Sequence, residues 1–163
     1  MKRTMILVSA FALLLAASDL FAAGSLTVAT SPITFGLYDL FSPTDNTAGQ
    51  GEVAVTYVAG PNPNAPINYT ITISVSPNSG SINPRTMKQV PPTADALNYN
   101  VYTDAARTII WNSVITGGAD IIALRLRRND PQPQRTPVYG SIRALQDVSV
   151  GTYSDNLTVT ITW

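Results

Sequence analysis

The stretch from Gly151 to Trp163 constrains the fold of this chain more strongly than any other segment. From its seventh residue onward, apolar residues alternate strictly with threonines or other polar residues. The apolar residues of this row are Leu157, Val159, Ile161 and Trp163. A period of two, built from β-branched and aromatic residues, predicts a β-strand with one buried face.

A strand this apolar needs hydrogen-bonding partners on both of its edges or a means of protecting an open one. Two arrangements provide such partners. Earlier strands of the same chain can pair with it on both sides, or one partner can come from another molecule by strand addition. The pattern of the strand is compatible with both arrangements.

The rest of the chain repeats the alternation in short segments, of which Ile67 to Val75 and Leu97 to Thr103 are the clearest. About eight such segments, at roughly ten-residue spacing and separated by turn residues, predict an antiparallel β-sandwich or barrel in a single domain. The Ile, Val and Tyr residues on the inward faces favour the sandwich. The region from Pro77 to Pro92 is expected to be a loop, with Arg85 and Lys88 on a solvated surface.

The composition argues against several classes of function. The 163 residues contain no Cys and no His, so disulfides, thiolate chemistry and the commonest general base are missing. Glu52 is the single glutamate, and the aspartates are scattered through loops, where they usually cap turns. Basic and acidic residues are equal in number, at 10 each, which gives no electrostatic signal for a nucleic-acid partner. We therefore expect neither an enzyme nor a bound cofactor or metal.

Residues 1–22 have the organisation of a secretory signal peptide. Lys2 and Arg3 are followed by an apolar run from Met5 to Ala17 and then by small residues at Ala22 and Ala23. Cleavage is predicted after Ala22, with Ala23 as the alternative, and an uncleaved membrane anchor is the competing interpretation. Residues 23–163 would then be one exported domain without a membrane-spanning run.

Four motifs resemble those of the spore coat protein U (SCPU) family. The string from Leu97 to Trp111 resembles the family signature, and Ile33 to Asp39 resembles its opening motif. Tyr139-Gly140, and the segment Gly151 to Asp155 with the alternating strand that follows it, resemble the closing motifs. The motifs occur in the order of the family and cover nearly all of residues 23–163.

The resemblance implies a subunit of an archaic chaperone–usher pilus, a fimbria that Gram-negative bacteria use for cell adhesion and biofilm formation. It implies an immunoglobulin-like sandwich that is incomplete because its last strand is missing. A periplasmic chaperone would supply that strand first, and the N-terminal extension of the next pilus subunit would supply it afterwards, with an outer-membrane usher as a further partner. The row of Leu157, Val159, Ile161 and Trp163 would then line the acceptor groove.

The chain departs from the family in two ways. Members often carry two cysteines, and the matching positions here are Leu26 and Tyr57, which we expect to form an apolar pair in place of the disulfide. Cleavage after Ala22 would leave only three residues ahead of Leu26, a reach of ~10 Å. We therefore expect a subunit that accepts a strand but does not donate one, as at a pilus tip or terminus.

Two alternatives stay open at this point. The segment from Leu26 to Phe35 could itself be released to act as a donor strand. The chain could also be a stand-alone secreted β-sandwich that recognises a glycan or a surface through its loops, for which residues 77–95 and 127–137 are the candidates.

Overall fold

In a computed structural model, residues 4–8, 25–58, 67–91, 95–111, 122–126 and 133–163 are described. These residues form strands, turns and loops and contain no helix. The strands are β1 (Thr4–Val8), β2 (Ser25–Thr34), β3 (Asn46–Val58), β4 (Ile67–Ile73), β5 (Arg85–Val90), β6 (Ala96–Tyr102), β7 (Ile122–Leu126), β8 (Gln134–Ile142), β9 (Thr152–Ser154) and β10 (Thr158–Thr162). The prediction of an all-β fold is confirmed.

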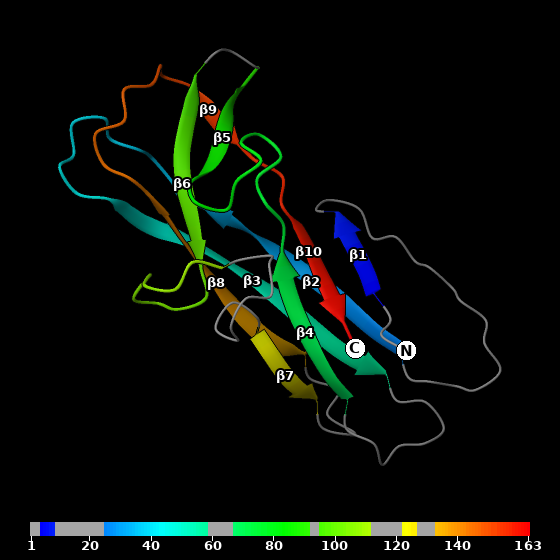
Figure 1. Cartoon of the computed structure of the whole chain (residues 1–163). Helices are drawn as coiled ribbons and strands as arrows, with labels where there is room; N and C mark the ends of the chain where they lie inside the picture. The colour runs from blue at the N-terminus through cyan, green and yellow to red at the C-terminus, as the bar shows by residue number, and fades with distance from the viewer. Residues whose placement is uncertain (1–3, 9–24, 59–66, 92–94, 112–121, 127–132) are drawn as a thin grey trace.

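The strands form two antiparallel sheets (Figure 1). The smaller sheet has four strands in the order β1-β10-β4-β7, and the larger has six in the order β2-β3-β8-β6-β5-β9. The strands β3, β4, β6 and β10 bury the apolar side of their alternation in one core, which is the packing expected of a sandwich. The buried apolar residues include Tyr69, Ile71 and Ile73 of β4, Val53 and Val55 of β3, and Leu97, Tyr99 and Val101 of β6.

The end of β2 is fastened to the larger sheet by glycines. Gly49 of β3 and Gly140 of β8 are direct cross-strand partners, and the ring of Phe35 lies over both. A Cβ on Gly49 would lie 2.4 Å from a ring carbon of Phe35, and one on Gly140 would lie 2.7 Å away. The Phe35 ring also meets Tyr99 edge to face, with centroids 5.8 Å apart. The register of β2 shifts between Ser31 and Thr34, which agrees with the bend expected at the intervening proline.

The expectation of a solvated loop around Arg85 is wrong. Residues Arg85 to Val90 form β5, which pairs with β6 and β9, and the Arg85 side chain is fully buried. Its guanidinium donates to the carbonyls of Ile82 (3.2 Å), Ser74 (3.2 Å) and Trp111 (2.7 Å). Ser74 directly follows β4 of the smaller sheet, and the backbone N–H of Trp111 donates to the carbonyl of Val101 in β6 of the larger sheet (2.8 Å). This cation therefore links segments that are bonded to both sheets. Burial lowers the pKa of Arg85.

The two loops expected to recognise a ligand are only partly described. Within residues 77–95, the strand β5 occupies Arg85–Val90 inside the larger sheet, and residues 77–84 form turns and loop ahead of it, so only this first part stays a candidate binding loop. Residues 127–132 lie outside the described residues, and β8 begins at Gln134.

Candidate functional site

The predicted apolar row is found on β10 and at its two ends. Val159 and Ile161 are buried in the core, while Leu157 and Trp163 are partly buried and pack against it. One edge of β10 pairs with β4, in a register that joins Val159 to Ile73 and Ile161 to Ile71. The row therefore faces the space between the two sheets, as its alternation predicts.

The second edge of β10 is occupied by β1. The two strands pair antiparallel over five residues, from Thr4 opposite Thr162 to Val8 opposite Thr158. Figure 1 shows β1 on the outside of β10, at the margin of the smaller sheet. Both edges of β10 are thus paired within the chain, and the second partner lies within residues 1–22, the predicted signal peptide.

The pairing with β1 has a direct physical consequence for a chain that lacks those residues. Backbone N–H and C=O groups that β1 satisfies along β10 would lose their partners, and such groups are costly to leave unpaired in a partly buried setting. An edge strand without a partner is also a template for another chain. We name the edge of β10 that β1 occupies the acceptor edge.

The other predicted site residues are only partly tested by the structure. Leu26 and Tyr57 are direct cross-strand partners in β2 and β3, and Leu26 is buried. The side chain of Tyr57 lies outside the described residues, so its contact with Leu26 as a replacement for a disulfide stays a prediction. The predicted cleavage positions, Ala22 and Ala23, also lie outside them.

The described aspartates serve the architecture of turns and strand ends. Asp104 accepts hydrogen bonds from the backbone of Ile109 (2.8 Å) and Thr108 (3.0 Å), and these hold its pKa below the usual value. Asp155 accepts from the hydroxyl of Tyr99 (2.8 Å) and from the amide of Asn78 (2.9 Å). Burial, followed by the charge of Asp155, raises the pKa of Tyr99.

Groups of three or more potential metal ligands are absent from the part of the chain that the structure describes. No helix among the described residues is long and apolar enough to cross a membrane.

Two solved or curated proteins resemble this chain in part. Protein U of Myxococcus xanthus is 34% identical over 79 residues, which are 48% of this chain and 40% of that protein. The chain therefore matches less than half of the length of this relative. A chain from a structure described as a chaperone–tip adhesin complex of CFA/I fimbriae biogenesis matches 98% of this chain and 42% of its own length, with 15% identity and a TM-score of 0.41. A likeness at this TM-score is too weak to support a shared function.

The comparison with protein families is more specific. The model of the Spore Coat Protein U domain matches residues 11–160, which include the strands β2 to β9 in full and the first three residues of β10. The motifs that resemble this family lie within that match, except for the last residues of the final strand, Ile161 to Trp163. The chain belongs to the Spore Coat Protein U domain family.

Proposed function

We propose that this chain is a secreted structural subunit of a surface fimbria, pilus or coat, which is assembled by strand addition at the acceptor edge. The observation that carries this proposal is the antiparallel pairing of β1 with β10 over five residues. Membership of the Spore Coat Protein U domain family supports it.

Strand addition at the acceptor edge is favoured in two ways, by main-chain hydrogen bonds and by the burial of apolar side chains. An added strand gains a ladder of main-chain hydrogen bonds along Thr158 to Thr162. In the register of β1, its second and fourth residues lie opposite Ile161 and Val159, both of which face the core. Directly opposite residues of an antiparallel pair share a face, so apolar side chains at these two positions would extend the core.

The partners follow from this site. A periplasmic chaperone would cover the acceptor edge after export and removal of the signal peptide, and another pilus subunit would replace it at the outer-membrane usher. Cleavage after Ala22 would leave too short a segment ahead of β2 to act as a donor, which favours a tip or terminal position. The protein would then pass through the periplasm of a Gram-negative bacterium to the cell surface.

The alternative donor, the segment from Leu26 to Phe35, is disfavoured by its contacts. Most of it belongs to β2, which pairs with β3 from Ser25 to Thr34, and its last residue lies over two glycines of the larger sheet. Releasing it would break this ladder and uncover the core around Tyr99. We therefore propose that β2 stays in place and that the subunit accepts without donating.

The test uses residues 23–163, which lack the segment that occupies the acceptor edge. A labelled peptide with the sequence of Thr4–Val8 should bind this shortened chain and raise its melting temperature, because a ligand of the folded state stabilises it. The matched control peptide has Asp at its second and fourth positions, opposite Ile161 and Val159. It should bind at least tenfold more weakly, because each position loses an apolar contact.

Two results would contradict strand addition at β10. A shortened chain that melts cooperatively at high temperature, and responds neither to the peptide nor to a periplasmic chaperone, would contradict the proposal. Removal of Ile161 to Trp163 should abolish both folding and chaperone capture, and capture that survives this deletion would show that β10 is not the acceptor.

A further inference from the structure

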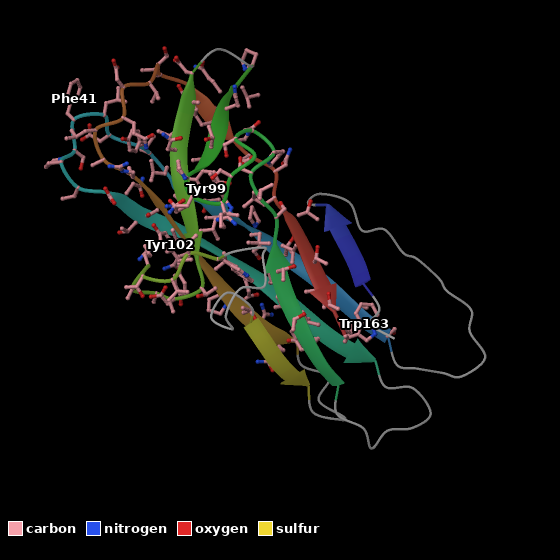
Figure 2. All side chains as sticks on the ribbon, viewed as in Figure 1. Phe41, Tyr99, Tyr102 and Trp163 are labelled. Carbon is pink, nitrogen blue, oxygen red and sulfur yellow. The ribbon has the colours of Figure 1, made fainter. Side chains whose placement is uncertain are left out.

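The outer face of the larger sheet carries a hollow of about 280 Å³. Its lining comes from β2, from β3 and from residues at the start of β8, and we name it the sheet hollow. Figure 1 shows β2 and β3 side by side behind β10 and β4. Figure 2 shows Trp163 at the end of β10, so the acceptor edge belongs to the smaller sheet and the sheet hollow to the larger one. The two sites are therefore separate.

The alternation of the strands explains the shape of the sheet hollow. Val53 and Val55 of β3 are buried in the core, so Ala54 between them points outward. Its direct cross-strand partner in β2 is Ala29, and both carry only a methyl group. The next outward pairs along the two strands have longer side chains: Thr27 opposite Thr56, and Ser31 opposite Glu52. The two alanines thus form the floor, and the longer side chains form the walls.

Arg135 of β8 closes one side of the sheet hollow. It lies directly opposite Ala54, and its guanidinium donates to the carboxylate of Glu52 in an ion pair. The two charges cancel, so this wall is neutral as a whole, although it presents N–H donors beside a carboxylate acceptor. The Arg135 side chain is 62% exposed, which leaves part of it accessible to a ligand. Arg135 also belongs to residues 127–137, one of the two regions expected from the sequence to recognise a ligand.

Hydroxyl groups line much of the remaining wall. The side-chain hydroxyls of Ser31 and Thr56 have no hydrogen-bond partner within the described part of the chain. The hydroxyl of Thr27 makes one long bond, to the carbonyl of Thr56 at 3.4 Å. Each hydroxyl can both donate and accept, so the wall offers both kinds of group to a ligand without adding charge.

These features fit an uncharged ring that carries several hydroxyl groups. A charged ligand gains little net attraction from an ion pair that is already neutral. The hydroxyls of a neutral ligand can instead donate to Glu52 and accept from Arg135, while the methyl groups of Ala29 and Ala54 contact the C–H face of the ring. The volume lies just below the range of ~300–1,000 Å³ typical of small-molecule pockets, so it fits one ring and not a chain of rings.

We propose that the sheet hollow binds a neutral hexose unit of a glycan. Ala29 and Ala54 contact the ring, and Glu52 and Arg135 hold its hydroxyl groups. This binding is independent of strand addition, because the sheet hollow and the acceptor edge use different residues and different sheets. Either site can therefore fail its test without affecting the other.

The experiment follows amide chemical shifts of the full chain by NMR during titration with the methyl glycosides of glucose, galactose and mannose. At least one of them should shift the amides around Ala29 and Ala54, with a Kd of about 1 mM, as expected for a ligand of this size. Ala54→Leu fills the floor and should weaken binding at least about tenfold. The matched control, Gln50→Leu, changes an exposed residue of the same strand outside the hollow and should weaken it less than about twofold.

Two further measurements define the ligand. Glu52→Gln should weaken binding about tenfold, because a hydrogen bond to a charged acceptor is lost. The soluble polymer of the sugar that binds (dextran, galactan or mannan) shows which unit of a glycan is taken. Binding of the polymer as tight per unit as that of the methyl glycoside supports recognition within a chain, and weaker binding supports recognition of a chain end.

Three outcomes would overturn the proposal. The absence of localised shifts with all three glycosides at about 50 mM, well above the expected Kd, would mean that the hollow takes no neutral hexose. Equal losses in Ala54→Leu and Gln50→Leu would place the sugar elsewhere. Tighter binding of glucuronate or glucosamine than of methyl glucoside would assign the hollow to a charged ligand. Thermal melting checks that the variants are folded, and Ala29→Leu replaces Ala54→Leu if that variant is not.

Discussion

The two sheets close their edges in different ways. The larger sheet is built entirely from residues after the predicted signal peptide, and its first strand is fastened by Phe35 over Gly49 and Gly140. The smaller sheet has β1, from inside the predicted signal peptide, at its margin. Residues 23–163 therefore contain a larger sheet that keeps its strands and a smaller sheet that loses one. Under the proposed function, this difference would place strand addition at β10 rather than at β2.

Removal of the Arg85 guanidinium, which links the two sheets, should have the largest effect on the free energy of unfolding. Replacing Arg85 with Met should lower the free energy of unfolding by about 4 kcal/mol, because buried carbonyls of Ile82, Ser74 and Trp111 lose a charged donor. The control is Lys88→Met in the same strand, which should change it by less than about 1 kcal/mol. Urea unfolding of both variants measures this. A cost for Arg85→Met no larger than the control would mean that the guanidinium does not hold the sheets together.

The second prediction separates a residue at the acceptor edge from an equivalent residue in the larger sheet. Ile161→Ala and Val53→Ala both remove buried methyl groups and should each cost about 2 to 3 kcal/mol in the full chain. In residues 23–163, only Ile161→Ala should also weaken binding of the strand peptide. Titration by fluorescence anisotropy measures this binding. Equal weakening by both variants would show that the peptide responds to global stability and not to β10.

The third prediction concerns the anchoring of β2. Gly140→Ala places a Cβ 2.7 Å from the Phe35 ring and should cost about 2 kcal/mol through overpacking. Phe35→Leu should recover part of that cost in the double variant, although alone it destabilises. A double-mutant cycle from thermal melts measures the coupling. Additive effects would mean that β2 is not held by this contact.

The smallest prediction compares one buried tyrosine from each sheet. Tyr99 of the larger sheet donates to Asp155, whereas the hydroxyl of Tyr69 in the smaller sheet has no hydrogen-bond partner among the described residues. Tyr99→Phe should therefore cost about 1 to 2 kcal/mol, and Tyr69→Phe should be close to neutral. Chemical unfolding at pH 7 measures both. A larger cost for Tyr69→Phe would reveal a partner for its hydroxyl.

The raised pKa of Tyr69 makes the free energy of unfolding depend on pH in the alkaline range. Burial raises the pKa of Tyr69 from 10.0 to about 12, so the folded state holds its proton where the unfolded state releases it. The contribution of Tyr69 is thus complete below pH 10.0 and is lost as pH rises toward 12. Tyr69→Phe should make the decline of stability over this interval shallower. An unchanged slope in unfolding measurements at these pH values would contradict the assignment.

The sequence predicts those parts of the fold in which local pattern and burial agree. β4, β6 and β10 alternate apolar and polar residues, so both their structure and their buried faces could be read directly. β5 was missed because its inward-facing Arg85 becomes acceptable only through carbonyls brought close by the fold, such as that of Trp111. No local pattern carries that information.

The candidate site shows the same division. The apolar row of β10 follows from its alternation, but the occupant of its second edge does not, because β1 and β10 lie near opposite ends of the chain. The run that includes most of β1, from Met5 to Ala17, is apolar apart from Ser9, which is typical of a signal peptide and shows no alternation of a strand.

Amide hydrogen exchange of residues 23–163, with and without the strand peptide, tests the central claim most directly. Without the peptide, amides of β10 from Thr158 to Thr162 should exchange much faster than those of β3 and β8, because only the smaller sheet has lost a strand. Adding the peptide should protect β10 and leave β3 and β8 unchanged. Protection of β10 that equals that of β3 without the peptide, and does not rise with it, would contradict the account.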